Sequence, residues 1–210
     1  MQPSTGRLLS VGHSNHDWPR LLALLRGAGV TAVADVRSSP YSRRLPEYNR
    51  AALEGALRAN EIGYAFLGDL LGGRPSDPGL YHPEGWADYA RMRQTAAFRR
   101  GLDRLLLGAE DYTVAMLCSE EDPLDCHRGL MITPALAELG RPPLHLRKDG
   151  SLETTADMEK RLLQATGVGD GLLDGLFAAQ LDEAERRSLM VEAYRHRNRR
   201  VAYRIHAEED

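Results

Sequence analysis

Cysteine is scarce in this sequence, which has only Cys118 and Cys126 among 210 residues. Two cysteines are too few for a disulfide framework and suit a reducing compartment, where both remain thiols. Long apolar runs are also missing, since no stretch approaches the roughly 20 residues that cross a bilayer. Residues 1–15 lack the basic, apolar and small-residue segments of a secretory signal. We therefore expect a cytoplasmic protein with no membrane partner.

The composition is otherwise that of a globular protein, with 42% hydrophobic and 27% charged residues. The length suits one main domain with an appendage. A net charge of −3 hides a basic segment at residues 186–206, where seven arginines against one glutamate give a local charge of +6. This segment is either a footprint for phosphate groups or a solvated helix face.

Short apolar runs alternate with amphipathic stretches over the first 150 residues. The runs at 8–11, 31–36, 62–67, 112–117 and 143–146 predict strands. The stretches between them predict helices that begin after Asp17 and Asn49 or span about 86–106 and 126–139. Strand, helix and strand joined by short links form right-handed parallel units. The expected fold is α/β, an open, mostly parallel sheet with helices on both faces.

A turn signal at Asp149 and Gly150 closes this alternation. Two further helices are predicted at about 155–166 and 180–198, with a glycine-rich link at 167–175 between them. The chain is thus expected to divide into an α/β domain at 1–150, which carries the site, and a helical extension at 151–210, which is basic near its end.

Polar side chains follow three of the predicted strands at the point where each strand ends. The carboxyl ends of parallel strands meet at one edge of a sheet, where ligands bind. We therefore expect these side chains to form one anion-binding site. They are, in chain order, His13, Asn15, Asp35, Arg37, Cys118 and Glu120.

The roles of these residues stay open at the level of sequence. His13 and Asn15 are either a general base and its orienting amide or groups that satisfy the loop backbone. Asp35 is either an acid or base beside its ion partner Arg37 or half of a structural salt bridge. Arg43, with tyrosines nearby, offers a phosphate contact or belongs to a solvated loop.

The segment CSEEDPLDCHR, residues 118–128, ends in a thiol, an imidazole and a guanidinium at a predicted helix start. A helix N-terminus and nearby cations lower the pKa of a thiol, so Cys126 is a candidate nucleophile, or else a small buried helix residue. His127 and Arg128 are candidate anion contacts. A metal site would combine Cys118 and Cys126 with His127 or His13, but the sequence has no CxxC pair and no paired-histidine spacing, so we predict no metal site.

Three ordered motifs, VGHSNHDW, DVRSSPYSRRLPEYN and LCSEEDPLDCHRGLM, resemble the family called domain of unknown function 488. The resemblance covers roughly residues 7–148 and ends before the basic extension. It implies a Rossmann-like α/β fold and one shared site, but it supplies no reaction and no cofactor. The positions that it places in this site are His13, Asn15, Asp35, Arg37, Arg43, Cys118, Glu120, Cys126, His127 and Arg128.

The leading hypothesis is an enzyme that acts on a phosphate-bearing substrate, either a nucleotide or a nucleic acid. In this hypothesis arginines hold the anion, and His13, Asp35, Glu120 or Cys126 does the proton or nucleophilic work. One alternative is a nucleic-acid-binding module without catalysis, which would use the same arginines and the basic extension. Another is thiol-based phosphatase or sulfurtransferase chemistry at Cys126.

Overall fold

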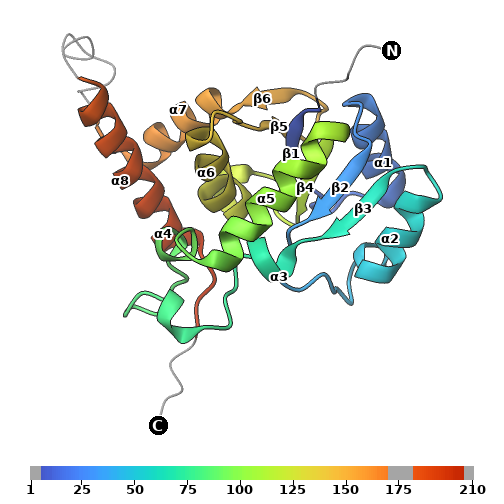
Figure 1. Cartoon of the computed structure of the whole chain (residues 1–210), viewed down its shortest axis with the longest axis horizontal. Helices are drawn as coiled ribbons and strands as arrows, with labels where there is room; N and C mark the ends of the chain where they lie inside the picture. Colours follow the sequence, from blue (N-terminus) through green and yellow to red (C-terminus); the bar gives the residue numbers. More distant parts are fainter. Residues whose placement is uncertain (1–5, 170–181, 206–210) are drawn as a thin grey trace.

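The computed structural model describes residues 6–169 and 182–205 and contains a six-stranded sheet with the order β3-β2-β4-β1-β5-β6 (Figure 1). Strands β1 to β5 are parallel, and β6 pairs with β5 in the antiparallel sense. The expected open, mostly parallel α/β architecture is confirmed. The strands are β1 (Leu8–Gly12), β2 (Ala32–Asp35), β3 (Gly63–Phe66), β4 (Val114–Cys118), β5 (Leu144–Leu146) and β6 (Leu152–Thr154).

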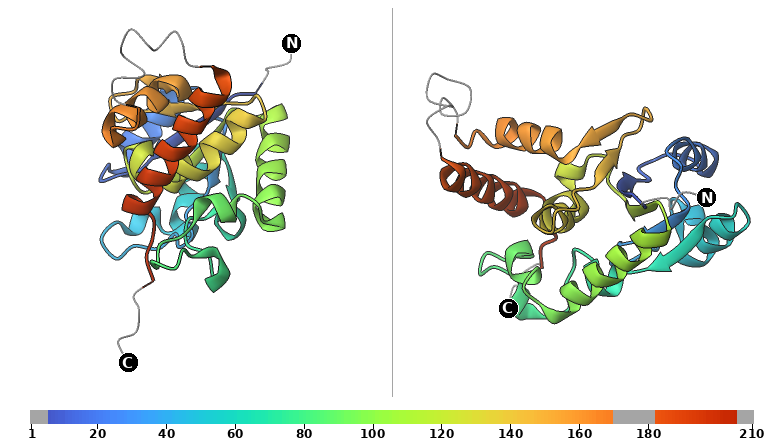
Figure 2. Two further views of the ribbon diagram at one scale, coloured as in Figure 1. Left: turned by 90° about the vertical axis from the view of Figure 1, so that its left-hand side faces the viewer. Right: turned by 45° about the horizontal axis from the view of Figure 1, so that its top comes forward.

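A hydrophobic cluster lies on each face of the sheet. Leu9 and Val11 of β1 pack with residues of α1 (Trp18–Gly27) and α2 (Arg50–Arg58). Leu8 of the same strand packs with residues of α5 (Ala96–Asp111), α6 (Thr133–Glu138) and α7 (Thr155–Thr166). Because alternate side chains of a strand point to opposite faces, the helices form two layers around the sheet, as Figure 2 shows.

The predicted helix at 86–106 is two helices, α4 (Tyr89–Met92) and α5. The break occurs because Thr95 has an extended backbone and its hydroxyl accepts a hydrogen bond from the Phe98 N–H, which caps α5. Trp86 precedes α4 but is still part of the core, with 2% of its surface exposed. A further short helix, α3 (Gly68–Leu71), follows β3 directly.

The expected helix at 126–139 begins differently. Cys126 follows a 3₁₀ turn at Pro123–Asp125, and the chain then forms a π-helix at Arg128–Ile132 before α6. The Thr133 N–H bonds to the Arg128 carbonyl five residues earlier, and Pro134 has no N–H to offer Leu130. Cys126 therefore does not lie at the start of an α-helix, which corrects the prediction.

The last part of the chain adds to the sheet as well as to the helices. The turn at 149–150 leads into β6, which pairs with β5 and which the sequence did not predict. Helix α7 spans the predicted residues, and α8 (Glu183–Val201) ends three residues beyond the predicted helix. The predicted start of that helix at 180, part of the glycine-rich link and the end of the basic segment lie outside the described residues.

Helix α8 packs beside α7, where the Tyr194 hydroxyl donates to Glu159 at 3.0 Å. Beyond α8, Arg204 forms a β-bridge with Trp86. None of the described helices has the length and apolar character to cross a membrane. Most arginines of the basic segment are exposed, namely Arg186, Arg187, Arg195, Arg199, Arg200 and Arg204.

A buried histidine makes the stability of this sheet depend on pH. His145 of β5 is 1% exposed, and its Nδ1 lies 2.7 Å from the Ser10 hydroxyl oxygen of β1. Its Nε2 has no partner among the described residues. Burial, followed by the charges of Arg128 and Arg147, lowers the pKa of His145 to about 3.

Because the unfolded histidine has a pKa of about 6.5, protons bind the unfolded chain first as the pH falls. We expect the free energy of unfolding to decrease below about pH 6.5, by up to roughly 1.4 kcal/mol per pH unit for this group. Urea unfolding between pH 7 and pH 4.5 measures this slope. His13, whose pKa burial lowers to about 4, adds to it, so His145→Gln should reduce the slope without abolishing it. Equal slopes in both proteins would contradict the assignment.

Candidate active site

Two thiols and one imidazole converge at the carboxyl edge of the sheet. Cys118 is the last residue of β4, and Cys126 and His127 return to it after the 3₁₀ turn at Pro123–Asp125. The His127 Nδ1 lies 3.6 Å from the Cys118 Sγ and 3.7 Å from the Cys126 Sγ. The three residues are 2–8% exposed. We call them the thiol–imidazole cluster.

The hydrogen bond on the far side of the His127 ring fixes its tautomer. The ring Nε2 lies 2.9 Å from the Val36 carbonyl oxygen, next to the end of β2. A carbonyl only accepts, so Nε2 carries the hydrogen and the lone pair of the neutral ring is on Nδ1. That lone pair faces both sulfur atoms.

The two thiols differ in their acidity. Burial opposes ionisation of both, and it raises the pKa of Cys118 well above its usual value, with Cys126 and Glu120 adding to the rise. At Cys126 the hydrogen bond from Cys118 and the charges of Arg128 and His127 outweigh burial, so the pKa falls well below its usual value. Negative charge in the cluster therefore concentrates on the Cys126 sulfur.

The acid-base groups beside the thiols respond to this charge. Burial lowers the pKa of His127, but the neighbouring Cys126 thiolate more than reverses this effect and the net shift is upward. The pKa of Glu120 is raised by burial and by the charge of Cys126. A Glu120 carboxylate oxygen lies 3.1 Å from the Cys118 Sγ, although the residue as a whole is exposed.

The cluster opens into a pocket of about 150 Å³. Arg74 lies at its rim with an exposed side chain, and its guanidinium stacks over the Tyr203 ring at 4.8 Å. Among the described residues, no carboxylate pairs with Arg74. Ser38 and Ser39 from the loop after β2 and Tyr89 from α4 complete much of the wall. The pocket thus places an unpaired cation and hydroxyl groups around two thiols.

Five of the ten predicted site residues line this pocket, namely Arg37, Cys118, Glu120, Cys126 and His127. The other five, His13, Asn15, Asp35, Arg43 and Arg128, do not appear in its wall. Asn15 and Arg43 are exposed on loops. The buried members of this second group have partners within the protein.

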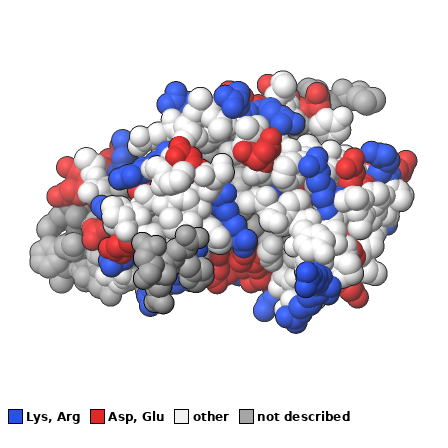
Figure 3. Space-filling view, turned by 90° about the horizontal axis from the view of Figure 1, so that it is seen from below, with Lys and Arg blue, Asp and Glu red and all other residues white. Residues whose placement is uncertain are grey.

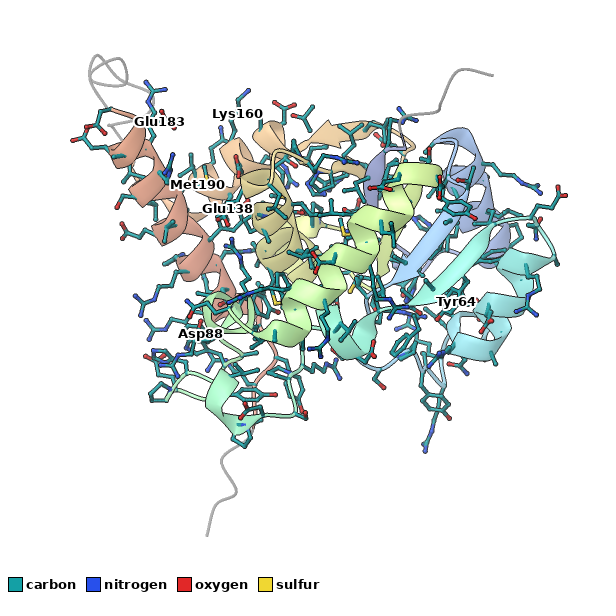
Figure 4. All side chains as sticks on the ribbon, in the orientation of Figure 1. Tyr64, Asp88, Glu138, Lys160, Glu183 and Met190 are labelled. Atoms are coloured by element: carbon teal, nitrogen blue, oxygen red, sulfur yellow. The ribbon has the colours of Figure 1, made fainter. Side chains whose placement is uncertain are left out.

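Asp35 is fully buried and forms a two-pronged ion pair with Arg37, with N···O distances of 2.9 and 2.6 Å. The Tyr64 hydroxyl of β3, labelled in Figure 4, also donates to Asp35 at 2.9 Å. Behind Arg37, the His13 ring stacks on Tyr48 at 4.1 Å, and its Nε2 lies 3.5 Å from an Arg37 nitrogen. Asp35 and His13 thus contact Arg37, which lines the pocket, but they do not line it themselves.

Arg128 is 1% exposed, and its two terminal nitrogens donate to the carbonyl oxygens of Glu120 and Glu121, both at 2.7 Å. It therefore holds the loop that follows β4 and adds positive charge behind the cysteines. Its predicted role as an anion contact finds no support in these bonds.

The sequence analysis did not identify Arg74 as a site residue. The two glycines before it do indicate that the backbone approaches another group closely at this point. A Cβ on Gly73 would lie 2.8 Å from the Cβ and Cγ of His127, so only glycine lets the backbone approach the ring this closely. The pair Gly72 and Gly73 within a long connection marks such an approach.

A larger hollow of about 950 Å³ lies between α8, α6 and α4, where Asp88, Glu138 and Met190 are labelled in Figure 4. It shares Tyr89 with the thiol pocket, but no cysteine or histidine is among its lining residues. It contains no nucleophile or base comparable to the cluster, so the smaller thiol pocket is the candidate site.

The family described as "Domain of unknown function DUF488" matches residues 17–133, which contain all of the thiol–imidazole cluster. The match also covers Arg37 and Arg74. Neither curated proteins nor solved structures give a match.

Proposed function

The chain belongs to the family described as domain of unknown function DUF488, whose description names no reaction, and we propose that it is an enzyme that acts on a phosphate-bearing substrate. In this proposal Arg74 binds the anion at the rim of the thiol pocket, and the thiol–imidazole cluster provides the reactive groups. The proposal rests on one observation, namely that Arg74 and the thiol–imidazole cluster line the same pocket.

The size of the pocket supports a small inserted group. A volume of about 150 Å³ holds about five water molecules at roughly 30 Å³ each. A phosphoryl group fits this space and a whole nucleotide does not. The remainder of the substrate would therefore lie outside the pocket, near Tyr203.

The end of α8 supports a substrate that extends beyond its phosphate. Val201 and Tyr203 line the pocket, so the basic segment reaches its rim. Arg200 is exposed and has no partner among the described residues, whereas Arg199 pairs with Glu84 at 2.9 Å. A nucleotide or a nucleic-acid end could contact these side chains while its phosphate enters the pocket.

The exposed arginines of the basic segment also favour a second candidate function, nucleic-acid binding without catalysis. Figure 3, however, shows Lys and Arg interspersed with Asp and Glu on the face seen from below, rather than one broad basic surface. Binding through many phosphates weakens steeply with salt, whereas a single anion in a pocket responds weakly. A steep salt dependence would favour this second function.

Replacing Arg74 by alanine tests the proposed anion contact. A charge-assisted hydrogen bond contributes about 1.5–3 kcal/mol, so we expect inorganic phosphate to bind about 10- to 100-fold more weakly to Arg74→Ala. Isothermal titration calorimetry measures both affinities. The matched control is Arg43→Ala, which removes an exposed arginine outside the pocket and should leave the affinity unchanged. Equal weakening in both variants would refute a specific role for Arg74.

Cys126→Ser tests whether Cys126 is a covalent nucleophile, as the phosphatase or sulfurtransferase alternative requires. Once a substrate turns over, retained activity in this variant would exclude phosphatase or sulfurtransferase chemistry through a covalent bond to Cys126. Loss of turnover with phosphate binding intact would show that the thiol is required for the chemistry.

A further inference from the structure

We propose that Cys118, Cys126 and His127 bind one zinc ion through both sulfur atoms and the His127 Nδ1, with the fourth coordination position open to the thiol pocket. A role for this ion in the reaction rests on the proposed function. The binding of the ion rests on the cluster alone.

The first argument is the spacing of the three ligand atoms, which all lie within 4.8 Å of one another. Zinc bonds of about 2.3 Å to sulfur and about 2.0–2.1 Å to nitrogen, at a tetrahedral angle of about 109°, place sulfur and nitrogen about 3.6 Å apart. The two observed distances between sulfur and nitrogen are 3.6 and 3.7 Å. Two of the three edges of the cluster therefore match one face of a zinc tetrahedron, and the third edge, between the two sulfur atoms, is no longer than 4.8 Å.

The second argument is the number of lone pairs. The neutral His127 ring has one lone pair, on Nδ1, and can accept a hydrogen bond from one thiol at a time. Both sulfur atoms nevertheless approach that nitrogen at nearly equal distances. Without an ion, the Cys118 thiol can donate to the Glu120 carboxylate at 3.1 Å and leave Nδ1 to Cys126, whereas a single cation at the centre would bond to both sulfur atoms and to the nitrogen together.

The third argument is the hydrogen bond behind the ring. Histidine ligands of metals commonly donate their other ring N–H to a carbonyl or carboxylate, which orients the ring. The Val36 carbonyl accepts this bond from His127 at 2.9 Å, and the close packing of Gly73 holds the ring in place. The lone pair is thus directed at the cysteines before any ion binds.

The ligand types select the class of metal. Two thiolates and one imidazole suit zinc and other thiophilic ions, whereas magnesium and calcium require oxygen ligands. Zinc sites with a purely structural role have four protein ligands, and catalytic sites have three with one position for water or substrate. Because the cluster lines the pocket that Arg74 borders, that open position would face a bound phosphate.

Zinc binding is tested first on the wild-type chain after treatment with a chelator. We expect one equivalent of zinc to bind, with both thiols reacting with a chromogenic disulfide reagent before zinc is added and neither reacting afterwards. Cobalt(II) should give the intense visible bands of a tetrahedral site and a thiolate-to-cobalt charge-transfer band. No uptake of zinc, with equal thiol reactivity in both states, would overturn the proposal.

Ligand variants then locate the ion. Cys118→Ser, Cys126→Ser and His127→Gln should each weaken zinc binding at least about 100-fold, since each removes one of three ligands. The control is His82→Gln, which changes a half-buried histidine outside the cluster and should retain full affinity. Unchanged affinity in all three ligand variants would overturn the assignment, and the wild-type measurements do not depend on whether these variants fold.

Phosphate binding to the same metal-free protein keeps the two proposals distinct. If zinc binds and phosphate does not, the metal site stands and the proposed substrate class fails. If phosphate binds in an Arg74-dependent manner and zinc does not, the proposed function stands and the metal site fails.

Discussion

Replacing Asp35 by alanine is expected to lower the free energy of unfolding by about 3–5 kcal/mol, because it leaves the Arg37 guanidinium buried without its counter-charge. Asp35 is fully buried and Arg37 is 5% exposed. The carboxylate also accepts bonds from the Arg37 backbone N–H at 3.2 Å and from the Tyr64 hydroxyl. The substitution therefore removes the acceptor of four donors, which are the backbone N–H and two guanidinium nitrogens of Arg37 and the Tyr64 hydroxyl. Urea unfolding at neutral pH measures the change.

The matched control is a double-mutant cycle with Arg37→Met. Removing both charges leaves no ion unpaired, so Asp35→Ala with Arg37→Met should be more stable than Asp35→Ala alone. If the double variant is instead as unstable as the sum of the two single variants, the ion pair does not account for the loss.

Replacing Arg128 by methionine is the second change with a large expected effect. The carbonyl oxygens of Glu120 and Glu121 would lose their donors, and each unsatisfied group costs about 1–3 kcal/mol. We expect the free energy of unfolding to fall by about 2–5 kcal/mol, because loss of the buried side chain's packing adds to this cost. Unfolding curves of the variant and of wild type give the difference.

Arg128→Lys is the matched control, since lysine keeps the charge but lacks the planar fork that reaches two carbonyls. Its stability should lie between those of wild type and Arg128→Met. Inorganic phosphate should bind Arg128→Lys with nearly the wild-type affinity, because Arg128 is buried and bonded to the loop. A loss of phosphate affinity comparable to that of Arg74→Ala would restore Arg128 as an anion contact and contradict this role.

The sequence predicted the sheet and its polar edge well because both follow from local patterns. The polar residues after β2 and β4 lie at the same edge, as the rule for parallel strands requires. Helix α7 matched its predicted span, since Thr154 caps it and Gly167 ends it in the left-handed conformation.

The direction of side chains could not be predicted in this way. His13 and Arg128 lie at the expected edge, but one bonds to Arg37 and the other to backbone carbonyls. The hydrogen-bond partners of these side chains depend on their rotamers and on the paths of the loops, and the hydrophobic periodicity of the sequence specifies neither. The same limit applies to Arg74, which reaches the pocket from the long connection between β3 and α4.

The sequence offered Cys118, Cys126 and His127 as one possible set of metal ligands, but their convergence could not be predicted from it for a related reason. Seven residues separate Cys118 from Cys126, more than the two to four that typically separate paired zinc-binding cysteines, and the chain returns through a 3₁₀ turn between them. His127 follows Cys126 directly and precedes a π-helix, where the sequence predicted an α-helix that begins at Cys126. Both features are local irregularities that an amphipathic pattern does not reveal.

The most direct test of the account is whether a bound anion covers the thiols. In chelator-treated protein, iodoacetamide alkylation of Cys118 and Cys126 is measured with and without inorganic phosphate. At a phosphate concentration ten times its dissociation constant, we expect alkylation to slow about tenfold, and Arg74→Ala to lose this protection at the same concentration. Phosphate that binds without changing the alkylation rate would place the anion elsewhere and contradict the claim that one pocket holds both.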